Sequence, residues 1–230
     1  MIWAVLRAEL AAQDGQKLNV VDVGGGTGGF AVPLAESGHT VTVVDPSPDA
    51  LAALLRRAAD AGVADRVHGL QGDADSLTSL VSAGEADLVL CHAVLEFADD
   101  PASVAAALAR VLRPGGAASV LVANRAAAVL GRAIAGQFRL AEQLLTTTAG
   151  DRVSGRGSLL RRFDIEGATG LLTAAGLSVE QVHGVRVVAD WVPGVLSDTD
   201  PEGLVGFELA ASDLPPYRDI ATQLHLLARR

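Results

Sequence analysis

Residues 17–29, KLNVVDVGGGTGG, decide the fold. The first seven residues form a largely apolar, β-branched run that is typical of a buried strand. Five glycines and one threonine follow, and the spacing predicts a helix over residues 28–37 that Gly38 ends. A strand, a glycine-rich turn and a helix in this order predict the start of a βαβ unit, with unpaired backbone amides at the beginning of the helix.

The same alternation continues through the first half of the chain. Further strands are predicted over residues 40–45, 66–71, 87–92 and 118–123, with helices over residues 49–61, 76–83 and 101–112. A helix over residues 164–175, a strand over 177–188, a short helix over 204–211 and a last strand over 221–228 complete the pattern. Strands that alternate with helices predict an α/β fold with a parallel sheet, which binds ligands at the carboxyl ends of its strands.

Residues 124–162 interrupt the pattern and carry an unusual charge. They are predicted to be helical over 126–145 and loop-like afterwards, as an insertion within a single domain that spans 1–230. Seven arginines stand against two acids there, a net charge of +5, whereas the rest of the chain carries −14. Such a basic island favours an anionic substrate, although a solvated helix face is the simpler interpretation on charge alone.

Composition excludes several classes of protein. The single cysteine, Cys91, excludes a disulfide scaffold and a cysteine-rich zinc site, and five dispersed histidines predict no metal site. The apolar runs are too short to cross a bilayer, and the first residues lack the features of a signal peptide, so we expect a cytoplasmic protein that avoids membranes. Aromatic residues make up only 3% of the chain, too few for a platform that stacks single-stranded nucleic acid.

The glycine loop itself fits two ligands. Gly24, Gly26 and Gly29 match the G-x-G-x-x-G fingerprint of dinucleotide sites, which would indicate NAD. Gly24, Gly26 and Gly28 equally match the D-x-G-x-G-x-G loop of S-adenosylmethionine-dependent methyltransferases. Asp22 favours the second interpretation, because a carboxylate sits poorly beside a pyrophosphate but suits a sulfonium and an α-ammonium group.

Three more polar residues follow predicted strands. Asp45 is placed to accept both hydroxyls of an adenosine ribose, and Ser47 is a better cap for the next helix than Asp45 is. Asp73, in the run Gly72-Asp73-Ala74, is either an acceptor for the adenine amine or a turn residue. His92 is either a site residue or a packed histidine, and its place at the same sheet edge favours the site.

Several segments together resemble class I S-adenosylmethionine-dependent methyltransferases. They are DVGGGTG (22–28), TVTVVDPSP (40–48), HAVLEF (92–97) and LRPGG (112–116). HAVLEF, Asn124 with AGQF (135–138), and GVRV (184–187) resemble more narrowly the tRNA 5-carboxymethoxyuridine methyltransferase family. The resemblance runs from about Leu18 to His225. It implies a Rossmann-like, doubly wound sheet of seven strands, mostly parallel with the last antiparallel, and helices on both faces.

The resemblance also implies an activity and a site. The activity is methyl transfer to the carboxylate of a modified wobble uridine in tRNA, with S-adenosyl-L-methionine as the cofactor. The implied cofactor-binding residues, with their neighbours in the same loops, are Asp22, Gly24, Gly25, Gly26, Asp45, Pro46, Gly72, Asp73, Ala74 and His92. Asn124 and Arg186 are the expected acceptor-binding residues.

Other functions remain open at the level of sequence. The acceptor could be a small carboxylic acid or another metabolite, and the chain could be a non-catalytic S-adenosylmethionine-binding module or an NAD-binding protein. No catalytic dyad or metal motif is found. A carboxylate acceptor is already ionised at neutral pH and needs no general base, so this absence favours carboxyl methylation.

Overall fold

A seven-stranded sheet forms the centre of the protein. The computed structural model describes residues 1–13, 15–146, 152–155 and 158–230. The sheet contains β1 (Asn19–Val23), β2 (Thr40–Asp45), β3 (Val67–Gln71), β4 (Ala86–His92), β5 (Leu112–Ala123), β8 (Ser178–Val185) and β9 (Gln223–Arg229). Its order is β3-β2-β1-β4-β5-β9-β8, and β9 alone runs in the direction opposite to the other six strands. The predicted Rossmann-like topology is thus confirmed.

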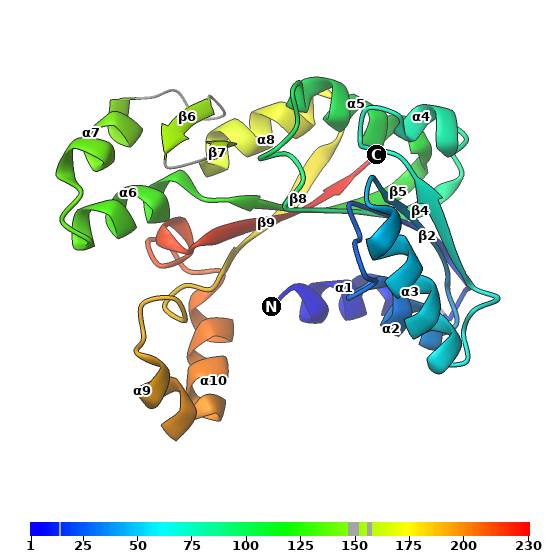
Figure 1. Cartoon of the computed structure of the whole chain (residues 1–230), viewed down its shortest axis with the longest axis horizontal. Helices are drawn as coiled ribbons and strands as arrows, with labels where there is room; N and C mark the ends of the chain where they lie inside the picture. The colour runs from blue at the N-terminus through cyan, green and yellow to red at the C-terminus, as the bar shows by residue number, and fades with distance from the viewer. Residues whose placement is uncertain (14, 147–151, 156–157) are drawn as a thin grey trace.

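Helices cover both faces of this sheet (Figure 1). One face packs against α1 (Ile2–Ala11), α2 (Ala31–Glu36) and α3 (Pro48–Asp60). The other packs against α4 (Leu77–Leu80), α5 (Pro101–Val111) and α8 (Ile165–Ala174). Successive strand residues point to opposite faces, so Val20 enters one core and Val21 the other. Both faces of the strands are therefore buried, as their continuous apolar runs predict.

Local signals explain where several helices begin. The Ser47 hydroxyl accepts a hydrogen bond from the Ala50 N–H at 3.2 Å, which confirms Ser47 as the cap of α3. The first predicted helix begins only at Ala31, because a turn closed by the Gly28 N–H and the Gly25 carbonyl precedes it. In α10 (Pro201–Ala211) Asp200 caps the Gly203 N–H, so this helix starts before the predicted residue 204.

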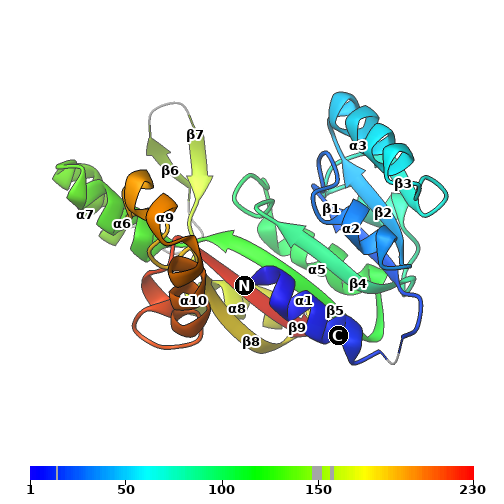
Figure 2. The same cartoon turned by 90° about the horizontal axis from the view of Figure 1, so that it is seen from below.

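The segment after β5 differs most from expectation. The predicted helical region is two helices, α6 (Arg125–Ile134) and α7 (Phe138–Thr146), separated by Gly136 with φ of +71°. The region predicted as loop contains two short antiparallel strands, β6 (Arg152–Gly155) and β7 (Ser158–Arg161). Pairing between strands satisfies backbone polar groups, which a Gly- and Arg-rich composition does not reveal. The helices α6 and α7 and the strands β6 and β7 lie with α9 (Gly194–Thr199) and α10 near the carboxyl end of β5 (Figures 1 and 2).

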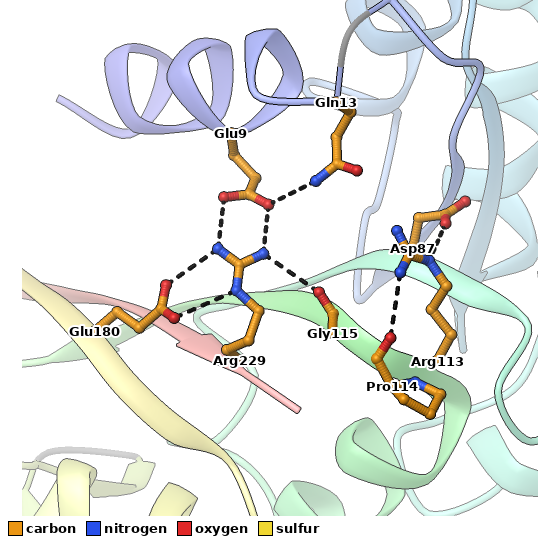
Figure 3. A network of polar contacts seen from close by, with 8 residues as sticks. All are labelled: Glu9, Gln13, Asp87, Arg113, Pro114, Gly115, Glu180 and Arg229. Carbon is orange, nitrogen blue, oxygen red and sulfur yellow. Dashed lines mark hydrogen bonds and ion pairs between the residues drawn. The ribbon is translucent and has the colours of Figure 1, made fainter.

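An ion-pair network fastens α1 to the sheet. The Arg229 guanidinium of β9 binds both carboxylate oxygens of the buried Glu9, at 2.7 and 3.0 Å, and it also binds Glu180 of β8 (Figure 3). The pair with Arg229 lowers the pKa of Glu9. Figure 2 shows α1 lying along β5 and β9. Two kinds of contact therefore hold α1 on the sheet. One is the ion pair of Glu9, and the other is the packing of Val5 and Leu6 into the apolar core.

Within the described parts of the chain, every helix is too short or too polar to pass through a lipid bilayer.

Candidate active site

The glycine loop follows β1, and its backbone donates hydrogen bonds to the carboxyl end of the neighbouring strand β2. The Gly24 N–H donates to the Val44 carbonyl at 2.8 Å, and the Gly26 N–H donates to Asp45 Oδ2 at 2.9 Å. A β-carbon on Gly25 would lie 2.5 Å from Asp22 Oδ2, and Gly26 has a φ of +55°. Close approach at the first position and left-handed backbone at the second both require glycine.

Asp45 at the end of β2 organises this loop. While Oδ2 binds Gly26, Oδ1 accepts the Ser47 N–H at 2.9 Å. A carboxylate has about four lone-pair sites, so each oxygen retains capacity for one more donor. Asp45 is thus pre-oriented by the backbone and still able to accept hydrogen bonds from a ligand.

A cavity of about 410 Å³ opens beside Asp45. Five of the predicted cofactor residues line it: Gly24, Asp45, Pro46, Asp73 and Ala74. The opposite wall comes from the segment after β4, including Val94, Phe97 and Ala98. The volume and the mixture of apolar wall and carboxylates suit a small ligand with a polar sugar-like part.

The other predicted cofactor residues lie around this cavity and not on its wall. Gly25 of the glycine loop packs closely against the Asp22 side chain, and the Gly26 N–H donates to Asp45. Gly72 follows β3, where a β-carbon would approach Leu80 and Ser76. His92 ends β4, and its side chain binds Ser119 on β5. The structure thus brings the glycine loop, Asp45 and the segment after β3 together around the first cavity. Asp22 and His92 do not line this cavity.

Asp73 has a local structural role. Its Oδ1 accepts the Ser76 N–H at 2.9 Å, and hydrogen bonds with Ser76 lower the pKa of Asp73. Asp73 is therefore a turn residue, which was one of the two roles that the sequence predicted for it. Because Asp73 also lines the cavity, the turn and the ligand interpretation are compatible.

Asp22 is a buried carboxyl group with unsatisfied bonding capacity. It is 2% exposed, and its Oδ2 has no hydrogen-bond partner among the described residues. Burial, with a further contribution from Asp45, raises the pKa of Asp22 to about 7. A buried carboxyl group of this kind is stabilised in its ionised form by a cation nearby.

His92 is held between an aromatic ring and a hydroxyl. Its Nε2 lies 2.9 Å from Ser119 Oγ, and its ring meets the edge of Phe30 with 4.8 Å between ring centroids. Burial lowers the pKa of His92 to about 4, so the ring is neutral at physiological pH. Phe30 is the residue that follows the glycine loop.

A second cavity, of about 280 Å³, lies at the carboxyl end of β5. Asn124 and Arg186, the two predicted acceptor residues, both line it, together with Arg162, Asp190 and Trp191. Arg186 has a φ of +59° and forms an ion pair with Asp190. This surface ion pair contributes little to stability by itself, because the Arg186 side chain is 54% exposed.

Asn124 is fully engaged by the backbone. Its amide donates to the carbonyls of Asp219 and Ala221, and its Oδ1 accepts the Ala126 N–H as the cap of α6. Asn124 therefore shapes the second cavity, and its part in binding an acceptor stays a prediction.

Glu96 is a buried carboxyl group near both cavities, and the sequence analysis did not single it out. Its Oε1 accepts the Ala123 N–H at 2.7 Å, whereas Oε2 is buried without a hydrogen-bond partner among the described residues. Burial raises the pKa of Glu96, and nearby Arg162 opposes this effect. Ala123 lines the second cavity and Phe97 the first, so Glu96 lies between the two. The sequence feature that could have indicated Glu96 is its position in the HAVLEF segment (92–97).

Comparison with known proteins identifies relatives along the whole chain. The chain is 31% identical over 233 aligned residues to the tRNA 5-carboxymethoxyuridine methyltransferase of Escherichia coli (strain K12), covering 100% of this chain and 87% of that protein. It is 32% identical over 166 residues to the ubiquinone biosynthesis O-methyltransferase of Methylococcus capsulatus, covering 71% and 68%.

A solved structure has the same fold. The S-adenosylmethionine-dependent methyltransferase from Mesorhizobium loti superposes with a TM-score of 0.64 at 20% identity, covering 99% of this chain and 97% of that one. Residues 21–120 match the model of a methyltransferase domain. That range contains the glycine loop, Asp45, Asp73 and His92. It follows that the chain belongs to the S-adenosylmethionine-dependent methyltransferases.

Proposed function

We propose that this protein methylates the carboxylate of 5-carboxymethoxyuridine at the wobble position of tRNA, in the cytoplasm. The observation that carries the proposal is the second cavity, at the carboxyl end of β5, which Arg162 and Arg186 both line. Guanidinium groups bind carboxylates and phosphates in a two-pronged geometry. The full-length similarity to a tRNA 5-carboxymethoxyuridine methyltransferase supports the same acceptor.

The first cavity fits the cofactor of this family. Asp45 would bind the ribose hydroxyls, Asp73 and Ala74 the adenine end, and the glycine loop the remainder. The unpaired Oδ2 of buried Asp22 suits a cation, which a nicotinamide dinucleotide would not place there. S-adenosylmethionine supplies a methyl group on a positively charged sulfur, and its transfer to a carboxylate oxygen gives a methyl ester.

The task of the protein is then alignment. An ionised carboxylate needs no base to remove a proton, so the chain must hold the acceptor in line and exclude water. We infer that Arg186 and Arg162 hold the acceptor and that residues 124–162 form the acceptor side of one domain spanning 1–230. Arg161 fixes this region to the segment after β4 by donating to the carbonyls of Ala98 and Asp99.

The raised pKa of Asp22 predicts a pH effect on stability. In the unfolded chain an Asp titrates near 4, whereas in the cofactor-free fold Asp22 titrates near 7. The folded protein therefore holds one more proton between these values, and the free energy of unfolding falls as pH rises through this window. Asp22→Asn should remove that slope and raise stability at pH 8 by up to about 4 kcal/mol, measured by denaturant unfolding.

The same substitution should weaken cofactor binding. A cationic ligand binds best when Asp22 is ionised, so affinity for S-adenosylmethionine should rise up to about tenfold per pH unit below pH 7 and level off above it. In Asp22→Asn this contribution should vanish, and any slope that remains belongs to the cofactor's own groups. Calorimetry at pH 6 and pH 8 measures both proteins. Equal slopes in both would remove Asp22 from cofactor binding.

The acceptor is tested with bulk bacterial tRNA and a labelled methyl donor. After digestion to nucleosides, the label should co-migrate with the methyl ester of 5-carboxymethoxyuridine and be released by mild alkali. Label that is stable to alkali would contradict carboxyl methylation. Absence of label from tRNA, with an active protein, would contradict tRNA as the acceptor and leave the small carboxylic acid.

Arg186→Ala should reduce acceptor binding and leave cofactor binding unchanged. Loss of one charge-assisted pair costs about 1.5–3 kcal/mol, or roughly ten- to a hundredfold in affinity. Arg132→Ala is the matched control, because Arg132 belongs to the basic stretch but binds Gln137 and does not line the cavity. Equal acceptor affinity in both variants would separate Arg186 from the acceptor site.

Salt separates the two acceptor classes. If tRNA is bound, neutralising Arg152, Arg156, Arg161 and Arg162 together should weaken binding and flatten its dependence on salt, since phosphate contacts release counterions. A small acid should show shallow salt dependence in every variant, and it should lose affinity on Arg186→Ala and on loss of Arg162, the two arginines that line the second cavity.

A further inference from the structure

A row of buried polar side chains leads away from His92 across three strands. His92 Nε2 lies 2.9 Å from Ser119 Oγ on β5, and Ser119 Oγ lies 2.8 Å from His225 Nε2 on β9. His225 Nδ1 lies 3.5 Å from His183 Nδ1 on β8, and His183 Nε2 lies 3.4 Å from Asp213 Oδ1. Ser119 and His225 are fully buried, whereas Asp213 is 64% exposed. The row therefore connects the surface beyond β8 with the end of β4.

The surface end sets the direction of every hydrogen bond in this row. The Asp213 carboxylate, 3.4 Å from His183 Nε2, carries no hydrogen and repels a bare nitrogen, so His183 carries its hydrogen on Nε2 and its Nδ1 is bare. A neutral histidine has one N–H, so His225 donates through Nδ1 and accepts at Nε2. Ser119 then donates to His225 and accepts from His92 Nε2. With the opposite order, His183 Nε2 and the Asp213 carboxylate would face each other as two acceptors.

The other end of the row agrees with this order. If His92 carries its hydrogen on Nε2, its Nδ1 is bare. Nδ1 is the buried His92 atom that has no hydrogen-bond partner among the described residues. The alternative form would bury an N–H group without an acceptor while Ser119 filled the Nε2 lone pair, which is a costly arrangement.

The environment of the row keeps its histidines neutral, as the order requires. Burial lowers the pKa of His92 to about 4 and that of His225 to about 3, and it lowers the pKa of His183. The charged groups that face His183 are Asp213, Arg218 and the Met1 ammonium, and the same ammonium faces His225. Only Asp213 favours the charged form of His183.

We propose that Asp213, His183, His225 and Ser119 are positioning residues that fix the tautomer and the ring orientation of His92 at the cofactor site. The ring of His92 supports Phe30, which follows the glycine loop and also packs on Trp3 of α1 at 5.1 Å between ring centroids. A ring held at one nitrogen by Ser119 keeps this aromatic support in one place. The link to cofactor binding rests on the proposed function, whereas the hydrogen-bond order does not.

The order is tested by nitrogen-15 NMR of the histidine rings in the full chain without ligand. The expected forms are Nε2–H for His92, Nδ1–H for His225 and Nε2–H for His183. Observation of His92 as Nδ1–H would overturn the proposal.

Asp213→Asn tests whether Asp213 sets the tautomer of His92 from the other end of the row. An amide can donate to His183 Nε2, so both orders become available, and His92 should show a mixture of its two forms. Asp65→Asn is the control, because Asp65 is also an exposed, ion-paired aspartate but lies outside the row. The same His92 spectrum in Asp213→Asn as in Asp65→Asn would show that Asp213 does not set the order.

Cofactor affinity tests the functional consequence. Ser119→Ala should weaken S-adenosylmethionine binding about fivefold, the effect of one hydrogen bond, and raise the KM for the cofactor more than it changes kcat. His225→Gln keeps an acceptor for Ser119 and should retain more affinity than His225→Leu, which fills space without accepting. Thermal unfolding shows that each variant is folded. Unchanged affinity with an altered His92 tautomer would overturn the positioning role alone, whereas absence of cofactor binding by the unmodified protein would overturn the proposed function.

Discussion

Replacing Gly26 with valine should abolish S-adenosylmethionine binding and leave a folded protein. Gly26 has a φ of +55°, and a β-branched residue in this region of backbone space costs about 1–3 kcal/mol. The nearest atom to an added β-carbon is Asp45 Oδ2 at 4.0 Å, so the valine methyls would cover the carboxylate that we assign to the ribose. Calorimetry with the cofactor and thermal unfolding measure the two effects.

Gly38→Val is the matched control for backbone strain. Gly38 has a φ of +99° and open space around its added β-carbon, but it lies at the end of α2, away from the cavity. It should lose stability and keep normal cofactor affinity. Normal affinity in Gly26→Val as well would show that the glycine loop is only a turn.

Asp45→Ala should lower the affinity for S-adenosylmethionine about ten- to a hundredfold. Removing one charged acceptor costs about 1.5–3 kcal/mol, and here the Gly26 and Ser47 N–H groups lose their partner as well. The loss should appear mainly as a higher KM for the cofactor. Asp45→Asn keeps one acceptor oxygen and should lie between the two proteins.

Asp49→Ala controls for the loss of a negative charge in the same segment. Asp49 is an exposed residue in the first turn of α3 and does not line the cavity. Its affinity should equal that of the unmodified protein. If Asp45→Ala behaves like Asp49→Ala in an intact fold, the ribose is held elsewhere.

Local sequence signals were enough to predict the sheet and one side of the site. The apolar run over residues 17–23, the glycine cluster after it and the cap at Ser47 depend on neighbours in sequence, and each is present in the structure. Asp45 and Asp73 follow their strands, so the parallel topology alone brings both to one sheet edge and into one cavity.

Features that depend on distant contacts could not be predicted in this way. The pairing of β6 with β7 in a stretch that looks like a loop depends on backbone groups, not on a side-chain pattern. Asn124 looks like an acceptor ligand in sequence, but two carbonyls almost a hundred residues away occupy its amide. The row from Asp213 to His92 joins residues from four strands and a loop, and no local spacing indicates it.

The pairing of Glu9 with Arg229 has a consequence for the order of folding during synthesis. The two residues are 220 positions apart, and β9 inserts between β5 and β8 only after residues 223–229 exist. On the ribosome, Glu9 of α1 therefore stays without its Arg229 partner, and the outer edge of β5 stays unpaired, until residues 223–229 have emerged. Truncation before residue 223 would thus leave the carboxylate of Glu9 unpaired and the backbone groups along the outer edge of β5 exposed.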